Sequence, residues 1–199
     1  MTEETLVFID EGFLSRLSKH FGEGKYIKFD KILFVKNLSK KEGLYAKHIY
    51  YATSPPFQSG RPTADEKKRK EGYDRFKNKF SKNKEVTILE GRCQRTKNKN
   101  GKFEYRQKGV DTILTMALSS FRIDYPTIKK IILIACDSDF VPVIKMLKEK
   151  GIDIILYSYY ERKRNTEFSR SNHLINECSK TRILKKEDFE KSKIERGKN

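Results

Sequence analysis

Tryptophan is absent from this sequence of 199 residues, and cysteine and histidine occur only three times each. The cysteines Cys93, Cys136 and Cys178 are far apart, which excludes a disulfide framework and a clustered cysteine zinc site. No apolar run approaches the roughly 18–20 residues of a membrane span, and the N-terminus shows no basic-plus-apolar signal segment. These absences predict a protein of the reducing cytoplasm that does not span a membrane.

Acidic residues are also few in comparison with basic residues. The chain has 44 Lys+Arg and 27 Asp+Glu, which give a formal net charge of +17. Residues 61–108 contain 17 basic and 7 acidic residues, a net of +10, and residues 180–199 contain 8 and 4, a net of +4. Such an excess favours polyanions, with nucleic acid first among them. A solvated helix face and a frayed tail are the alternative interpretation of these two stretches.

Short apolar runs alternate with amphipathic segments along the chain, which is typical of strands alternating with helices. Strands are expected at residues 5–10, 44–53, 86–91, 129–136, 152–157 and 182–184. Helices are expected at residues 13–21, 29–35, 62–80, 109–121, 140–150 and 169–178. Because the strands are almost continuously apolar, the predicted fold class is α/β, a sandwich of helices around a mainly parallel central sheet.

One segment interrupts this order. Residues 92–107 are predicted to form an inserted β-hairpin, because Asn100-Gly101 is the strongest short turn signal in the chain. No repeat or linker divides the sequence, so residues 1–185 are expected to form one domain. Residues 186–199 are expected to be a basic, flexible C-terminal tail.

Four aspartates follow or precede apolar segments at positions that a parallel sheet would bring together. Asp10 ends the first strand, Asp137 and Asp139 follow the most apolar strand, and Asp111 lies in the first turn of a helix. In such sheets the crevice outside the carboxyl ends of the strands is the usual binding site. Clustered carboxylates repel one another unless a cation neutralises them, and oxygen ligands without His or Cys suit Mg²⁺ or Mn²⁺. The sequence therefore predicts a metal site at this edge.

Helix capping is the alternative interpretation of the same acids. An aspartate at a helix N-terminus accepts backbone hydrogen bonds and interacts favourably with the helix dipole, and this would suffice for Asp111, Asp137 or Asp139. Capping explains Asp10 less well, because this residue ends a strand inside the segment FIDEGF.

Three segments, FIDEGFL, QKGVDTILTMAL and LIACDSDFVPVIKMLKEKGIDI, occur in this order between residues 5 and 184. Together they resemble the NYN domain family, a PIN-like group of nucleases. The resemblance implies a three-layer α/β/α Rossmannoid (PIN-like) sandwich that binds Mg²⁺ or Mn²⁺ through acidic residues and cleaves RNA. By the same resemblance, the family's metal-binding and catalytic acids correspond to Asp10, Asp111, Asp137 and Asp139.

The chain departs from the family pattern at three positions. Glu11, Phe13 and Ala117 stand where many relatives carry Gly, Asn and Asp, although one branch of the family has an aromatic residue in place of the Asn. The four principal acids are intact, so activity is expected.

Basic and polar residues near the predicted site are candidates for contact with a nucleic acid. Lys108 matches a basic residue that often precedes the mid-chain aspartate in the family. Exposed Lys and Arg are otherwise common at strand ends, and Ser138 could simply complete a turn. The full candidate set is Arg106, Lys108, Ser138, Arg162, Lys163 and Arg164.

The predicted function is that of a metal-dependent ribonuclease, with an endoribonuclease as the expected kind. RNA is the expected partner, DNA stays open as a substrate, no membrane is involved, and a homo-oligomer is compatible with the sequence. A non-catalytic RNA- or DNA-binding regulator on the same fold is the first alternative. A toprim-type metal-dependent DNA enzyme ranks lower, because it would use Glu11 with Asp137 and Asp139 but has no need of Asp111.

Overall fold

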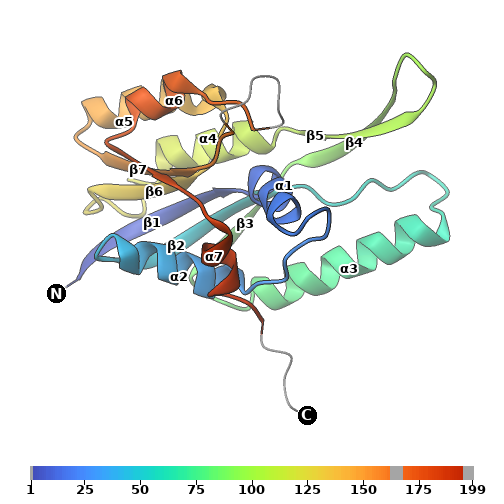
Figure 1. The fold of residues 1–199 in the computed structure, drawn as a ribbon, viewed down its shortest axis with the longest axis horizontal. Helices are drawn as coiled ribbons and strands as arrows, with labels where there is room; N and C mark the ends of the chain where they lie inside the picture. Colours follow the sequence, from blue (N-terminus) through green and yellow to red (C-terminus); the bar gives the residue numbers. More distant parts are fainter. Residues whose placement is uncertain (1, 162–167, 195–199) are drawn as a thin grey trace, which may run out of the picture.

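The computed structural model describes residues 2–161 and 168–194. Its centre is a six-stranded sheet in which every neighbouring pair of strands is parallel (Figure 1). In spatial order the strands are β3 (Val86–Glu90), β2 (Leu44–Thr53), β1 (Glu3–Asp10), β6 (Lys130–Ile134), β7 (Asp153–Ser158) and β8 (Lys180–Ile183). The expected parallel sheet is confirmed.

The direction of winding reverses beside β1. The chain first builds outward from β1 through β2 to β3, then returns to place β6 on the other side of β1. Ile9 pairs with Ile134, so the residues that follow these two strands emerge side by side at the carboxyl edge. This reversal is the point at which open α/β sheets bind their ligands.

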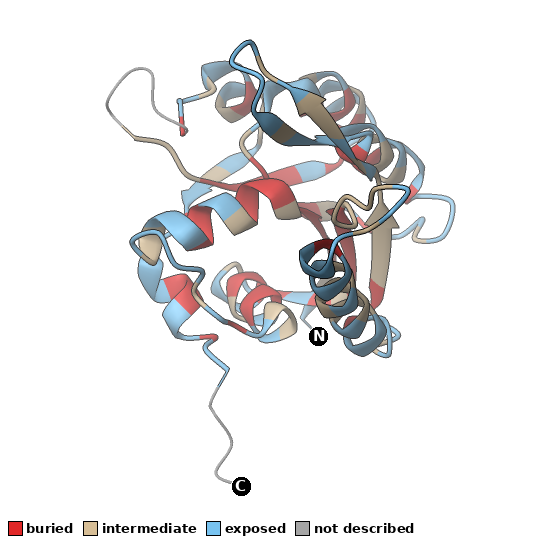
Figure 2. Cartoon of the chain, turned by 90° about the vertical axis from the view of Figure 1, so that its right-hand side faces the viewer, coloured by how far each residue is buried: buried red, intermediate tan, exposed pale blue. Residues whose placement is uncertain are grey.

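Helices cover both faces of the sheet, which confirms the three-layer α/β/α sandwich. One face carries α1 (Glu11–Phe21), α2 (Lys31–Lys41), α3 (Ala64–Phe80) and α7 (Lys186–Glu190), and the other α4 (Val110–Ser120), α5 (Val141–Glu149) and α6 (Asn172–Glu177). Side chains of β1 alternate between the two cores, because successive residues of a strand point to opposite faces. Val7 and Ile9 pack into the first core, and Leu6 and Phe8 into the second. Burial is accordingly concentrated in the strands and the inner helix faces (Figure 2).

The predicted hairpin is present as a separate two-stranded antiparallel sheet, β4 (Arg92–Lys97) and β5 (Phe103–Lys108). It extends beyond the carboxyl ends of the central strands, near the start of α3 (Figure 1). Arg95 holds it there: its guanidinium lies 4.7 Å from the ring of Phe57 and 4.4 Å from that of Phe103, and 3.8 Å from the carboxylate of Glu66 on α3.

The residues after Lys185 correct one expectation. A flexible tail was predicted from residue 186, but Lys186–Glu190 forms α7. Phe189 is fully buried, with its ring against those of Phe21, Phe29 and Phe34. The sequence KKEDFEKSK has a single apolar residue and so lacks the periodicity that identifies a helix. Residues 195–199 lie outside the described part of the chain.

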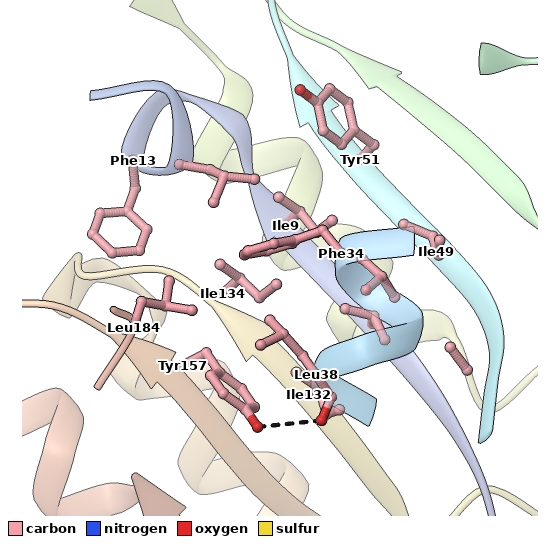
Figure 3. Packing of buried hydrophobic residues seen from close by; sticks show 14 of the residues in the cluster. Ile9, Phe13, Phe34, Leu38, Ile49, Tyr51, Ile132, Ile134, Tyr157 and Leu184 are labelled. Carbon is pink, nitrogen blue, oxygen red and sulfur yellow. Dashed lines mark hydrogen bonds between the residues drawn. The ribbon is translucent and has the colours of Figure 1, made fainter. Parts of the chain in front are cut away.

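A hydrogen-bonded group closes one end of the first core. Tyr157 reaches through the apolar side chains of this core and donates to the carbonyl of Leu38 at 3.2 Å (Figure 3) and to the carboxylate of Glu42 at 2.9 Å. Glu42 also accepts from Lys180 and from Arg182, the latter at 3.0 Å. Burial alone would raise the pKa of Glu42, but these hydrogen bonds outweigh it and hold the pKa below its ordinary value.

Replacing this carboxylate should weaken the fold in a pH-dependent way. Because the folded pKa of Glu42 is lowered, its contribution is fully present above the ordinary value of 4.5 and is lost as the pH falls through the folded pKa. Glu42→Gln should therefore reduce the free energy of unfolding by about 1–3 kcal/mol at pH 7. The difference from wild type should shrink as the pH falls below 4.5 and through the folded pKa of Glu42, because the side chain then becomes neutral like that of Gln.

Urea unfolding of both proteins at pH 7 and at pH 3.5 measures this difference. Glu190→Gln is the matched control, because within residues 2–161 and 168–194 the side chain of Glu190 forms only an exposed pair with Lys193, whose loss should change the free energy of unfolding by less than about 0.5 kcal/mol. An equal difference between wild type and Glu42→Gln at both pH values would contradict the assignment.

Candidate active site

A cleft of about 920 Å³ opens where β1 and β6 end. Carboxylates from three separate elements line it: Asp10 and Glu11 at the junction of β1 and α1, Asp111 on α4, and Asp137 after β6. The hairpin forms part of the opposite wall through Tyr105, Arg106 and Gln107. The parallel topology therefore brings together acids that are up to 127 residues apart in the sequence.

Asp10 is held at the base of this cleft. It is the last residue of β1 and precedes α1, with only 6% of its surface exposed. It occupies the N-cap position of α1 without a well-formed capping hydrogen bond, although interaction with the backbone N–H groups of Phe13 and Gly12 lowers the pKa of its carboxyl group. Burial outweighs this favourable interaction, so capping accounts for only part of the role of a carboxylate at this position.

The other predicted acids approach from α4 and from the turn after β6. Gly109, with φ of 77°, allows β5 to turn directly into α4 and places Asp111 in the first turn of that helix. Asp137 accepts a hydrogen bond from the backbone N–H of Asp139 at 3.0 Å and so caps the short 3₁₀ helix η1 (Ser138–Phe140). Capping is thus part of the role of Asp137, as the alternative interpretation allowed.

The electrostatics connect Asp111 with each of the other three acids. Burial raises the pKa of Asp10 to about 6, and the charge of Asp111 contributes to the increase. Partial burial also raises the pKa of Asp111, and the charges of Asp137 and Asp139 raise it further. Asp111 is therefore the common neighbour of the other three carboxylates.

Arg16 is the cation that partly offsets this repulsion. It lies on α1 and lines the cleft, and its charge lowers the pKa values of both Asp10 and Asp111. The net effect on both carboxyls is still upward, so one guanidinium does not balance the acidic group. Arg16 is not among the residues predicted for the site; its position four residues after Gly12, on the same helix face, was the available signal.

Glu11 is a second residue whose placement the sequence did not reveal. Its carboxyl group is half-buried beside the cleft, and burial raises its pKa to about 7 while the nearby Lys31 opposes the increase. Hydrogen bonds with Ser15 and Tyr51 also favour its charged form. Glu11 therefore adds a carboxyl group to the cleft where many relatives have glycine.

The donor set suits a hard divalent cation. In residues 2–161 and 168–194, no three Asp, Glu, His or Cys side chains lie close enough together to hold a metal ion directly between them. Mg²⁺ and Mn²⁺ nevertheless prefer oxygen ligands, and Mg²⁺ usually keeps several waters and takes only one or two carboxylates. The backbone of Gly12 lies close to the carboxylate of Asp10, because a Cβ added there would lie 3.2 Å from Asp10 Oδ1 and 2.9 Å from Gln107 Oε1, too close for an undisturbed side chain. The residues thus fit a hydrated ion better than a closed cage.

The predicted nucleic-acid contacts are only partly gathered at the cleft. Arg106 lines it and pairs with Glu104 at 3.1 Å, and Lys108 is exposed at the end of β5 without lining the cleft. Ser138 is exposed in η1. The remaining three candidates, Arg162, Lys163 and Arg164, lie outside the described residues.

Two of the departures from the family pattern have a structural explanation. Phe13 is fully buried in the first core, with its ring edge-on to that of Phe168, so it is absent from the cleft lining. Ala117 packs against the second core from α4. Neither side chain displaces one of the four aspartates.

The sequence profile of the NYN domain matches residues 4–184. The chain belongs to the NYN domain family. The NYN family is generally nuclease-related, its nucleases usually use divalent metals, and the domain implies nucleic acid substrates in general. Among the described residues of this NYN domain, no helix is both long and apolar enough to cross a membrane.

The fold of this NYN domain is also similar to that of a solved protein. A crystal structure of a protein of unknown function from Vibrio parahaemolyticus aligns with a TM-score of 0.55 and 12% sequence identity. The alignment covers 94% of this chain and 96% of the other. At this identity the likeness shows the fold alone. No curated protein matches the sequence significantly.

Neutralising Asp10 should stabilise the NYN domain in the absence of metal. A raised folded pKa means that ionisation disfavours the folded state: the penalty is absent below the ordinary value of 3.8, grows as the pH rises through about 6, and is complete at pH 8. Asp10→Asn should therefore raise the free energy of unfolding at pH 8 by roughly 1–3 kcal/mol, with little effect at pH 3.5.

Thermal unfolding in EDTA at both pH values tests this expectation. Asp124→Asn serves as the control, because Asp124 is exposed in the turn before β6, at the opposite edge of the sheet. Added Mn²⁺ should raise the melting temperature of wild type and of the control, but not that of Asp10→Asn. A variant that melts below wild type at pH 8 would contradict the electrostatic assignment.

Proposed function

We propose that this NYN domain is a metal-dependent ribonuclease that hydrolyses RNA phosphodiester bonds in the acidic cleft. One observation carries the proposal: Asp111 lies among the charges of Asp10, Asp137 and Asp139, and the repulsion that results is only partly offset by Arg16. Carboxylates arranged in this way raise the energy of the protein alone and are favourable once a divalent cation joins them.

The four aspartates would hold a hydrated Mg²⁺ or Mn²⁺, in part through its water molecules. When bound, such an ion polarises a phosphoryl oxygen, supplies a nucleophilic water at neutral pH and stabilises the leaving oxygen. Asp10 at the start of α1 and Asp111 on α4 both line the cleft, and Asp137 fixes the turn that carries Asp139. Arg16 and Arg106 line the same cleft and would orient the anionic substrate.

The basic block supports the binding of a phosphate backbone. In the fold, residues 61–108 form α3, β3 and the hairpin; Arg106 of the hairpin lines the cleft, and Arg69 of α3 lines an adjoining hollow. Backbone phosphates require many Lys and Arg on one surface and no particular spacing. Lys108 and Ser138, with Arg162, Lys163 and Arg164, stay candidates for such contacts.

Asp111→Asn should abolish cleavage. Purified protein is incubated with labelled single-stranded RNA and DNA in Mg²⁺, in Mn²⁺ and in EDTA. We expect wild type to cut RNA only with metal, and Asp111→Asn to cut at least roughly 100-fold more slowly, because it removes charge that positions the metal. Asp124→Asn should retain wild-type activity.

Two outcomes of this assay would contradict the proposal. Equal cleavage by wild type and Asp111→Asn, or cleavage that EDTA leaves unchanged, would contradict the metal-dependent mechanism. Tight RNA binding without cleavage under any metal condition would favour the non-catalytic regulator.

Increasing the salt concentration should weaken RNA binding steeply, and we expect two lysines at the tip of the hairpin to contribute to this dependence. Lys99 and Lys102 flank its turn and are exposed. Replacing both by Gln should make the slope of log K against log [salt] less steep by roughly 1–1.5, since each contact to a single strand contributes about 0.7. Binding is measured in EDTA by fluorescence anisotropy.

The matched control replaces Lys129 and Lys150, which are exposed at the opposite edge of the sheet. This double variant should keep the wild-type slope. A salt response that is flat in wild type would remove the role assigned to residues 61–108.

A further inference from the structure

A second hollow of about 730 Å³ adjoins the acidic cleft. Glu11, Tyr26, Tyr105 and Gln107 line both, so the two form one continuous depression. The second hollow, here called the aromatic groove, lies between the start of α2 and the face of α3 and is roofed in part by the hairpin. Its volume lies within the roughly 300–1,000 Å³ of pockets that hold a small ligand or part of a larger one.

Two exposed tyrosines stand where the cleft and the aromatic groove meet. Tyr26 is 62% exposed and Tyr105 is 49% exposed, so both rings are accessible to a ligand. Tyr105 is held in place from behind, since its ring lies 5.8 Å from that of Phe57 and 5.8 Å from the guanidinium of Arg69. A fixed, accessible ring is the arrangement that base stacking requires.

The aromatic groove contains two basic side chains. Lys31 lies in it with its ammonium 5.0 Å from the ring centre of Phe76 and 6.0 Å from that of Tyr51. Arg69 lines the same groove from α3. Glu11 is the acidic residue of this lining and interacts with Lys31, so Arg69 is the cation farther from the carboxylates of the cleft.

We propose that the aromatic groove binds unpaired nucleotides of single-stranded RNA next to the phosphate that occupies the acidic cleft. The bases stack on Tyr105 and Tyr26, and the phosphates between them lie near Arg69 and Lys31. Paired bases are already stacked in a duplex and cannot offer their faces, so the groove selects unpaired RNA. The assignment of the neighbouring phosphate to the cleft rests on the proposed nuclease function.

Binding measured without metal tests the groove separately from the chemistry. The probe is a fluorescein-labelled 12-nucleotide RNA of mixed sequence, titrated with protein in EDTA so that no metal-dependent cleavage intervenes. Tyr105→Ala and Tyr26→Ala should each weaken binding roughly 5- to 100-fold, the range found when one stacking partner is removed. Tyr105→Phe should bind like wild type, because it keeps the ring and loses only the hydroxyl.

Tyr45→Ala is the matched control. Tyr45 is 47% exposed, close to the value for Tyr105, but it lies at the start of β2, at the opposite edge of the sheet. Its removal should leave the affinity unchanged. Both groove tyrosines are exposed, so the variants should fold, and a melting temperature equal to that of wild type confirms this for each.

The comparison with other probes decides the class of ligand. Affinity for the same RNA annealed to its complement should be insensitive to Tyr105→Ala. Equal losses for the single strand and the duplex would overturn the proposal, since they would indicate a general phosphate-binding surface. Unchanged single-strand affinity in both folded alanine variants would also overturn it, and tighter binding of single-stranded DNA than of RNA would overturn RNA as the ligand.

The failure of this inference is distinguishable from failure of the proposed function. Tyrosine-dependent binding without any metal-dependent cleavage would support the groove and contradict the nuclease. Metal-dependent cleavage with tyrosine-independent binding would support the nuclease and contradict the groove.

Discussion

Parallel pairing of β1 with strands on both its sides is the constraint on which the site depends. Because β1 is parallel to both β2 and β6, every loop that leaves these strands emerges at the same edge. Asp10 and Asp137 are thereby forced together, and α4 adds Asp111 from the second helical layer. The fold tolerates their repulsion because β1 is buried on both faces, so the apolar burial of its other residues offsets the penalty of one ionised carboxylate.

Much of this could be predicted from the sequence, and the failures have physical reasons. Apolar runs and helical periodicity identify the strands and most helices, and parallel topology predicts that the aspartates share an edge. The helix α7 was missed because Phe189 is its only apolar anchor. The roles of Glu11 and Arg16 depend on how α1 is rotated as it leaves β1, and packing of the buried Phe13 sets that rotation, which no local pattern reports.

The net charge acquires a different meaning once it is placed in three dimensions. As a total of +17 it indicates only that a polyanion would be attracted. In the fold, the cleft is lined by carboxylates together with Arg16 and Arg106, and the groove beyond Tyr105 adds Lys31 and Arg69. A substrate strand would therefore meet acidic and basic groups at different points along the depression, which favours one position along the strand over its neighbours.

Gly12 determines how closely the hairpin can approach helix α1. The hairpin reaches α1 at this point, where Gln107 occupies the space that a Cβ would need. Arg95 ties the same hairpin to α3 through Glu66. The hairpin is thus attached to both helices, to α3 through an ion pair and to α1 through the contact of Gln107 with the backbone at Gly12. Any larger residue at position 12 would have to displace the end of the Gln107 side chain and so alter how the hairpin lies against α1.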